Sequence, residues 1–330
     1  MLQDDVLALL REAGADYRSG EAMSRALGVS RAAVWKAVEA LRGAGYGILS
    51  SPSRGYRLAS APDDLRAGEI AAALAGRVVG WEVVCLDTVD STNSEVKRRA
   101  AGGAPEGLAV LADGQTGGRG RRGRPFQSMP GKGLYCSVLL RPACPPEELG
   151  QLTAWTAVAV CRAIRDCCGA ECGIKWTNDL ILGGRKVCGI LTELELEAES
   201  AAALAVVAGI GINVGQTPAD FGPELAPAAT SLSQELRRPV RRAELAAALL
   251  RALDEMYAAF PAGKPEYLAE YRRWCVTTGR EVVLLRGKER VTAFAEEIDD
   301  RFALVCRLPG GGRETVTAGE VSVRGLLGYV

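Results

Sequence analysis

Apolar residues in the first sixty positions recur at helical spacing and predict three short helices. The first runs from Asp4 to Glu12, the second from a capping Ser19 to Leu27, and the third begins after Ser30. Gly28 separates the last two helices by a tight turn, which is the spacing of a helix-turn-helix. The third helix carries apolar residues at i, i+4 and i+7 on one face: Val34, Val38 and Leu41.

The apolar period then changes to that of strands. Two strand-like pieces, Tyr46 to Ser50 and Gly55 to Leu58, enclose a turn and predict a β-hairpin wing. With the apolar helix face buried, the start of the third helix is free to meet a DNA major groove and the wing tip a phosphate. The candidate DNA-binding residues are Ser30, Arg31, Ala32, Lys36 and Arg54. The alternative is a small helical domain that makes only protein contacts.

The middle of the chain mixes strand-like runs with helical stretches. Glycine-rich 206–214 is expected to be a buried strand, and 215–230 a long surface loop of which part closes on a nucleotide. The remaining strands are expected at 82–86, 108–111, 134–140 and 187–194, and the helices at 93–99, 242–260 and 265–274.

Four short strands joined by turns follow at the end of the chain, and they predict a small β-barrel resembling a Src-homology-3 fold. They are expected at 281–285, 291–298, 303–306 and 320–324, with turns at 286–287, 299–300 and 310–312. The predicted fold class is therefore α+β, with domains at 1–62, 63–278 and 279–330.

Length and charge refine this picture. The 330 residues, of which 48% are apolar, can supply more than one core. The net charge is zero, but residues 18 to 60 hold seven basic side chains against two acidic ones, which favours the head as the DNA-binding part. Neither a membrane span nor a secretory signal is found, so a cytoplasmic protein without a membrane partner is expected.

The sequence contains no histidine, which excludes Ser-His-Asp and Cys-His catalysis and histidine-ligated zinc. The ten cysteines include no Cys-x-x-Cys pair, and Cys161, Cys167 and Cys168 lie in an apolar helical run. Buried free thiols are therefore expected. Catalysis in this chain must use charge and positioning.

Two polar segments precede helices or strands in the middle of the chain. Asp90-Ser91-Thr92-Asn93 provides small hydroxyl and amide groups, which either cap a helix or bind a neutral ligand such as a cyclic urea. Gln115 to Arg124 alternates glycines with four arginines, and it matches neither a Walker loop nor a dinucleotide fingerprint. Glycine allows a close backbone approach and arginine binds anionic oxygens, so a mobile anion-binding loop is expected; a disordered basic loop is the alternative.

A third polar segment lies on a predicted hairpin. Gly183-Gly184 indicates a tight turn between two strands, which places four polar residues on adjacent rungs of one sheet. Two lysines with a carboxylate near a turn favour a functional site over solvated strand ends. The four residues are Lys175, Asn178, Asp179 and Lys186.

Taken together, these segments occur in the order and spacing of bacterial biotin protein ligases, which the chain resembles over nearly its whole length. The head, with Ser30 to Val34 opening its third helix, resembles the form that also represses biotin-synthesis genes. Three positions depart from the usual pattern: Thr177 and Met129 stand where proline is common, and Phe126 where tryptophan is common. The segments that carry the resemblance are Gly118 to Arg124, Lys175 to Leu180, Arg185 to Glu193 and Gly209 to Val214.

The resemblance implies a class II synthetase-like ligase core that is ATP-dependent and AMP-forming. Biotin and ATP would give biotinyl-5′-adenylate and pyrophosphate with the help of Mg²⁺. A lysine of a biotin carboxyl carrier protein, or of the carrier domain of a carboxylase, would then take the biotin and release AMP. The head would bind operator DNA, as a homodimer formed in the presence of adenylate or DNA.

The resemblance also implies site residues. Arg119, Arg121 and Lys186 would be catalytic, and Asp179 would hold Mg²⁺. The biotin site would consist of Ser91, Thr92, Asn93, Gln115, Arg119, Gly120, Arg121 and Lys186. The ATP or adenylate site would consist of Arg124, Phe126, Lys175, Asn178, Asp179 and Asn213.

The charges agree with such a reaction, because joining a carboxylate to a phosphate brings two anions together and fixed cations lower that barrier. Two alternatives remain open at this point. One is a transcription factor that senses biotin adenylate without transferring it. The other is a lipoate or octanoate ligase of the same general architecture.

Overall fold

The computed structural model describes residues 2–60, 63–74, 78–196, 204–286, 289–317 and 320–323. The chain divides into two compact units, Met1–Asp64 and Leu65–Val330. Each unit has buried apolar cores of its own.

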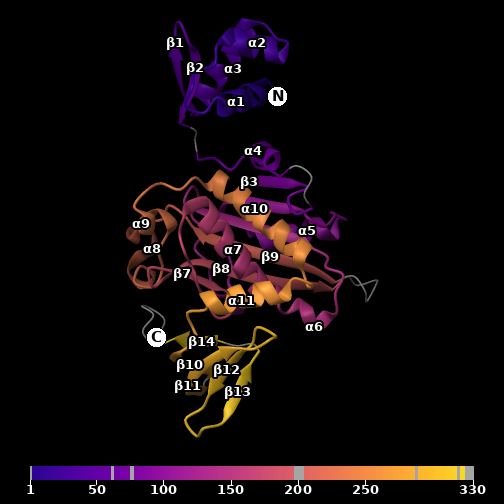
Figure 1. The fold of residues 1–330 in the computed structure, drawn as a ribbon, viewed down its shortest axis with the longest axis vertical. Helices are drawn as coiled ribbons and strands as arrows, with labels where there is room; N and C mark the ends of the chain where they lie inside the picture. The colour runs from indigo at the N-terminus through magenta and orange to yellow at the C-terminus, as the bar shows by residue number, and fades with distance from the viewer. Residues whose placement is uncertain are drawn as a thin grey trace. The chain divides into compact units, whose positions relative to one another are not determined.

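The first unit is a helix-turn-helix with a two-stranded antiparallel wing (Figure 1). Ser19 and Ser30 cap the second and third helices, where their hydroxyls accept bonds from the backbone N–H of Ala22 and Ala33 at 3.0 and 3.2 Å. Gly28 ends the second helix with a φ of 65°, in the region that favours glycine. The predicted head is confirmed. Its elements are α1 (Leu2–Glu12), α2 (Gly20–Leu27), α3 (Arg31–Gly43), β1 (Gly47–Ser51) and β2 (Gly55–Ser60).

The second unit contains a seven-stranded mixed sheet in the order β3-β4-β5-β9-β8-β7-β6. Only β3 and β4 pair in parallel among the described strands of this sheet. The strands are β3 (Val83–Val89), β4 (Ala109–Gln115), β5 (Gly133–Leu140), β6 (Gly173–Lys175), β7 (Asp179–Leu182), β8 (Arg185–Leu196) and β9 (Leu204–Asn213).

Alternation along β9 gives this sheet two different faces. Val206, Ala208, Ile210 and Ile212 belong to the large core that includes α7 and α10, whereas Val207 packs with Val96 of α5 on the opposite face. In Figure 1, α10 lies in front of the sheet. The α-helices of the unit, apart from α8 described below, are α4 (Ala67–Ala72), α5 (Thr92–Ala101), α6 (Pro146–Leu149), α7 (Leu152–Cys168), α9 (Leu232–Leu236), α10 (Arg242–Ala259) and α11 (Lys264–Trp274).

Aromatic packing fixes α7 against α11. The ring of Trp155 is fully buried and stacks on Tyr267 with 4.2 Å between centroids, and Phe260 meets it edge-on at 5.0 Å. Such pairs contribute about 0.5–1.5 kcal/mol beyond their buried area. The large core therefore provides a rigid support beneath the sheet.

The segment 215–230 is not a loop throughout, so that prediction was wrong. It contains α8 (Pro218–Leu225), which begins with a capping box between Thr217 and Asp220 and has Pro218 in its first turn. Gly222 interrupts the helix with a φ of 73°. The Gly222-Pro223 pair is a helix-breaking signal, and it obscured the start signals at Thr217 and Pro218, four to five residues earlier.

The C-terminal strands form a five-stranded antiparallel sheet in the order β13-β12-β11-β10-β14. Four strands were predicted and β13 was missed. The Src-homology-3-like barrel stays a prediction, because these pairings form an open order, and Gly287 of the predicted turn at 286–287 lies outside the described residues. The strands are β10 (Arg280–Arg286), β11 (Glu289–Ile298), β12 (Leu304–Arg307), β13 (Arg313–Val316) and β14 (Glu320–Val323).

All ten cysteines are free, seven of them buried and three half-buried. Burial raises the pKa of the Cys85 thiol to about 11 and that of Cys172 to about 12, so neither is a reactive thiolate at neutral pH. The prediction of free thiols is confirmed.

Every helix in the described ranges is too short or too polar to cross a membrane.

Candidate active site and DNA-binding surface

A cavity of about 510 Å³ opens on the face of the central sheet that α5 covers. Its lining includes Gly189 of β8 and Gly209 and Gly211 of β9, and Gly189 lies directly opposite Gly211 in the strand register. A Cβ atom on Gly211 would lie 2.6 Å from the ring of Phe126, and one on Gly209 would overlap the Asn93 side chain. Glycine is therefore needed at these positions to let the two side chains lie against the sheet.

The neutral end of the cavity is built at the start of α5. Ser91 occupies the N-cap position, but its side chain makes no capping bond, so the simple cap interpretation fails for it. The backbone N–H of Thr92 donates to Gln115 Oε1 at 2.8 Å, and Gln115 Nε2 donates to Ser128 Oγ at 2.7 Å. These uncharged groups suit a neutral, hydrogen-bonding ligand.

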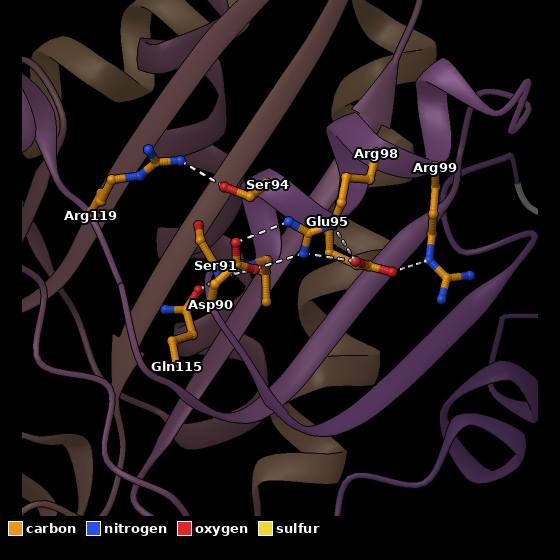
Figure 2. A network of polar contacts seen from close by, with 9 residues as sticks. Asp90, Ser91, Ser94, Glu95, Arg98, Arg99, Gln115 and Arg119 are labelled. Atoms are coloured by element: carbon orange, nitrogen blue, oxygen red, sulfur yellow. Dashed lines mark hydrogen bonds and ion pairs between the residues drawn. The ribbon is translucent and has the colours of Figure 1, made fainter.

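Ion pairs hold this helix start in place (Figure 2). The Arg98 guanidinium lies 2.7 Å from Asp90 and 2.9 Å from Glu95, and Glu95 also pairs with Arg99 at 2.8 Å. The bond from Arg98 lowers the pKa of Asp90 to about 2. Asp90 in turn accepts the backbone N–H of Ser91 at 2.8 Å, so the charges on the outer side of α5 orient the first cavity residue.

The glycine-arginine loop reaches two separate elements that line or flank the cavity. Arg119 donates to Ser94 Oγ of α5 at 2.7 Å, as Figure 2 shows. Arg121 donates to Asn178 Oδ1 at 3.1 Å, and Asn178 Nδ2 donates to the Ile190 carbonyl at 2.8 Å. These two contacts place the glycine-arginine loop across the cavity.

The charged end lies on β6, β7 and β8. Lys175 faces Asp179 in the strand register, and Lys186 Nζ lies 2.7 Å from Asp179 Oδ1. Lys186 Nζ is also 6.0 Å from the centroid of the Phe126 ring. Gly183 and Gly184, both with positive φ, form the predicted turn that brings β7 and β8 together. The strands that carry Lys175, Asp179 and Lys186 are therefore neighbours in the sheet, as predicted.

Asp179 is the sole carboxylate among the described residues that line the cavity. No cluster of three or more histidine, cysteine, aspartate or glutamate side chains that could hold a metal was found in the described ranges. Mg²⁺ at nucleotide sites takes one or two carboxylates and completes its shell with phosphate oxygens and water. Asp179 fits that pattern as one carboxylate, with Lys186 already at one of its oxygens.

The segment 215–230, part of which was expected to close on a nucleotide, lines one side of the cavity. Phe221, Leu225, Ala228 and Ala229 line it from α8 and the turn after it. Two backbone hydrogen bonds join this segment to Lys186 of β8. The N–H of Lys186 donates to the Ala228 carbonyl at 2.8 Å, and the N–H of Thr230 donates to the Lys186 carbonyl at 2.9 Å. Leu285 and Arg290 line it from the C-terminal sheet, and no local signal marks either of them.

All fourteen ligand-site residues predicted from the sequence line this one cavity, while their individual roles remain predictions. They are Ser91, Thr92, Asn93, Gln115, Arg119, Gly120, Arg121, Arg124, Phe126, Lys175, Asn178, Asp179, Lys186 and Asn213.

At two of the three positions that depart from the family pattern, Thr177 and Met129, the backbone carbonyl makes a hydrogen bond. The Thr177 carbonyl accepts from the Tyr271 hydroxyl, and the Met129 carbonyl accepts from that of Tyr135, both at 3.2 Å. Any residue supplies a carbonyl, so these contacts do not depend on the side chain. Phe126 instead offers its ring to the cavity.

On the head, the predicted DNA-binding residues Ser30, Arg31, Ala32 and Lys36 are exposed at the start of α3, and Arg54 is exposed at the wing. Ser30 is also the N-cap of α3, so its hydroxyl is partly engaged. Trp35, with 53% of its surface exposed, lies between Arg31 and Lys36 on the same helix and was missed.

A second feature of the head was also missed. Arg54 and Arg57 lie over the Tyr17 ring, 4.3 and 5.5 Å from its centroid, beside a surface pocket that all three residues line. Cation–π contacts of this kind hold flexible arginines in place. The signal in the sequence was only two arginines three residues apart, and Tyr17 lies far from them along the chain.

Two family profiles match the chain. That of the biotin/lipoate A/B protein ligase family matches residues 86–213, and that of an HTH domain matches residues 3–57. The first match covers the three polar segments of the cavity, and the second covers α1 through most of the wing.

Named relatives and a solved structure agree with these matches. The bifunctional ligase/repressor BirA of Bacillus subtilis is 41% identical over 78% of this chain and 78% of its own length. The protein of the same name from Escherichia coli is 31% identical over 97% of this chain and 96% of its own. A biotin protein ligase from Aquifex aeolicus in complex with biotin and ATP covers 74% of this chain and 99% of its own, with 29% identity and a TM-score of 0.63. The chain therefore belongs to the biotin/lipoate A/B protein ligase family, among the relatives that join the ligase to a helix-turn-helix head.

Proposed function

We propose that this protein is an ATP-dependent biotin protein ligase that also represses transcription through its head. The observation that carries the ligase proposal is the single cavity in which neutral polar groups at one end meet Arg121, Lys175 and Lys186 at the other. Biotin has a neutral ureido ring and a carboxylate, and ATP brings phosphates. The two ends of the cavity match these two kinds of group.

In the first half-reaction, a biotin carboxylate oxygen attacks the α-phosphate of ATP, the bond to the β-phosphate breaks, and pyrophosphate leaves. Lys186 and Arg121 neutralise the charge where the two anions meet. Mg²⁺, bound with Asp179 and phosphate oxygens, would add further positive charge to the triphosphate. The strands hold the lysines in fixed positions, so little reorganisation is needed as the charge develops.

In the second half-reaction, the amine of a carrier lysine attacks the carbonyl of the mixed anhydride, and AMP leaves with the bonding electrons. The amine must be neutral to attack. Arg119, Arg121 and Lys186 line the cavity and provide a positive environment that lowers the pKa of an incoming ammonium group.

The test is a carrier-labelling assay. The full chain is incubated with biotin, Mg·ATP and a biotin carboxyl carrier domain, and the mass of the carrier is measured. Attachment of one biotin supports the proposal, whereas a folded protein that binds biotin adenylate but leaves the carrier unmodified would be a sensor without ligase activity. Because the family also includes lipoate ligases, lipoate is offered in competition with biotin, and preferential transfer of lipoate would overturn the substrate assignment.

The repressor proposal rests on the exposed basic residues of α3 and the wing in a chain whose relatives are named as repressors. Two copies of the chain would present two recognition helices to a two-fold operator. Footprinting on DNA upstream of biotin-synthesis genes, with and without biotin and ATP, tests this role. Light scattering under the same conditions tests the dimer.

We also propose a boundary at 278 within the second unit, so that residues 279–330 act as a domain that assists carrier docking. Its sheet packs on the large core, and Trp176 Nε1 donates to the Phe302 carbonyl at 2.9 Å. Arg290 then extends the cavity lining from this part of the chain. Replacing Arg290 with alanine and measuring the KM for the carrier separates docking from a purely structural contribution.

A further inference from the structure

Trp35 is a large apolar side chain that the folding of the head does not use. It has 53% of its surface exposed, whereas Val34 and Ala37 on either side of it in α3 are buried. The head has a core of side chains from all three helices, and Trp35 belongs neither to that core nor to the described residues packed against it. A single exposed apolar residue is common on protein surfaces, so its meaning depends on where it lies.

The position of Trp35 is that of a residue facing a DNA groove. In a helix-turn-helix the second helix of the motif enters the major groove, and the residues near its start contact the base edges. That helix is α3, which begins at Arg31, so Trp35 lies one turn after its start. Arg31, Ala32 and Lys36 are exposed on the same turn. Trp35 is therefore within the part of α3 that reads sequence.

The charges around Trp35 favour a polyanion as its partner. Arg31 precedes it by one turn and Lys36 follows it directly, and both are exposed. Glu39, one turn after Trp35, has its carboxylate 2.6 Å from the Arg42 guanidinium, so its negative charge is already paired. A second copy of the chain packed face to face on Trp35 would bring like charges together, because a two-fold contact uses the same surface twice. Nucleic acid meets no such repulsion.

The chemistry of the indole ring narrows the base that it can recognise. Its one polar group is an N–H donor, and the rest of its surface is apolar. The base edges in the major groove of unmodified DNA carry hydrogen-bond donors and acceptors, and the C5-methyl group of thymine is the apolar group among them. An apolar ring on the recognition helix is therefore complementary to a thymine methyl group.

We propose that Trp35 is a specificity-determining residue of the head, which reads thymine by packing its ring against the C5-methyl group in the major groove. The proposal rests on the proposed repressor function and adds to it the kind of base that α3 selects. Arg31 and Lys36, which flank the ring, would contact phosphates or guanine on either side of that thymine.

The experiment compares two versions of one DNA fragment from upstream of the biotin-synthesis genes. One version contains thymidine and the other contains deoxyuridine throughout, which lacks only the methyl group. Fluorescence anisotropy measures the binding of the full chain to each in the presence of biotin and Mg·ATP. Each methyl group that is removed from water contributes about fourfold in affinity, so we expect the wild type to prefer the thymidine fragment on the order of tenfold over two half-sites.

Three variants assign this preference to Trp35. Trp35→Ala should bind the two fragments with similar affinity, whereas Trp35→Phe keeps an apolar ring and should keep most of the preference. Trp81→Ala is the matched control, because Trp81 is also an exposed tryptophan, 74% exposed, but belongs to the second unit. It should keep the wild-type preference. Normal carrier labelling by all three variants shows that the rest of the chain is intact.

The salt dependence separates an apolar contact from a contribution to charge. Trp35→Ala should leave the log–log slope of affinity against salt unchanged, because no phosphate contact is lost. A Trp35→Ala variant that still prefers the thymidine fragment tenfold overturns the proposal. So does a variant that weakens binding to both fragments equally and no longer dimerises in light scattering, since Trp35 would then contact a second copy.

Failure of the repressor function itself gives a different result. A wild-type chain that binds the thymidine fragment no better than unrelated DNA of the same length would overturn that function. A wild-type chain that binds the fragment specifically but does not distinguish thymidine from deoxyuridine would overturn only the role of Trp35.

Discussion

The cavity and the DNA-binding head place their polar residues in opposite ways. In the cavity, side chains far apart in sequence bond to each other, as Arg121 does to Asn178 and Asn93 to Glu193. On the head, the predicted DNA-binding residues fall between positions 30 and 54 and face solvent. The cavity residues are held by hydrogen bonds to one another, while most of the predicted DNA-binding residues of the head are exposed.

The two arrangements also differ in their response to salt. Pairs that are largely shielded from water, such as Lys186 with Asp179, are screened weakly, whereas exposed arginines and lysines are screened strongly at ordinary ionic strength. Binding of DNA should therefore weaken with salt, and binding of biotin should respond little. The predictions below test this contrast, from the largest expected effect to the smallest.

Replacing Lys186 with alanine should have the largest effect on the cavity. It removes a fixed cation from the point where carboxylate and phosphate meet, so adenylate formation should fall by about 10²- to 10³-fold. Pyrophosphate release measures the rate. Lys264→Ala, which removes a lysine beside Glu148 away from the cavity, is the matched control. Operator binding without biotin should be the same in both variants, and a Lys186→Ala enzyme that works at the wild-type rate would contradict the assignment.

Arg121→Ala should loosen the cover over the adenylate. Its bond to Asn178 spans the cavity, so the variant should release preformed biotinyl-adenylate faster, by roughly tenfold, in a chase with unlabelled biotin. The neighbouring Arg122 does not line the cavity and provides the control variant Arg122→Ala. Equal release rates for wild type and Arg121→Ala would remove the closing role of the loop.

Arg54→Ala should weaken binding of every DNA sequence to a similar degree. The log–log slope of affinity against salt should become shallower by about one unit, because one phosphate contact is lost. Fluorescence anisotropy at several salt concentrations measures the slope. Tyr17→Ala should have part of the same effect by freeing Arg54 and Arg57, while Tyr17→Phe keeps the ring and should not. Carrier labelling should be normal in all three variants.

The smallest effect concerns pH and the ion pair outside the cavity. The pKa of Asp90 lies at about 2 in the folded chain, below its ordinary value of 3.8, so its stabilising contribution is present above 3.8 and is lost as the pH falls toward 2. Asp90 and Arg98 are each about half exposed, so solvent screening keeps the contribution of the pair small. Urea unfolding of wild type and Asp90→Asn at neutral and at acid pH should show a difference that shrinks in acid; a constant difference would argue against the pair.

What could be predicted from the sequence follows the same contrast. Helices of the head were predictable because Ser19 and Ser30 cap them and apolar spacing marks their buried faces, all of which is local information. The motif residues of the cavity were found as separate segments. Their mutual contacts were not, because Asn93 and Glu193 are brought together only by the register of β8 and β9 and the packing of α5 on the sheet.

The missed elements have similar physical causes. The start of α8 was hidden by Gly222-Pro223, and β13 is a short strand of charged and polar residues with little apolar signal. Leu285 and Arg290 reach the cavity from a sheet that is distant along the chain. Their contribution depends on how one sheet packs against another, and no local pattern encodes that.

The facing glycines 189 and 211 make the size of the accepted ligand adjustable. Because both glycines lack a Cβ atom, the Phe126 ring packs directly on the backbone of the two strands. The absence of a Cβ at each position determines how close the ring lies to the sheet. Adding that carbon at Gly211 would lift the ring into the cavity and shorten it. A trimmed ligand would then be matched to the variant enzyme, while the wild-type enzyme keeps the deeper cavity.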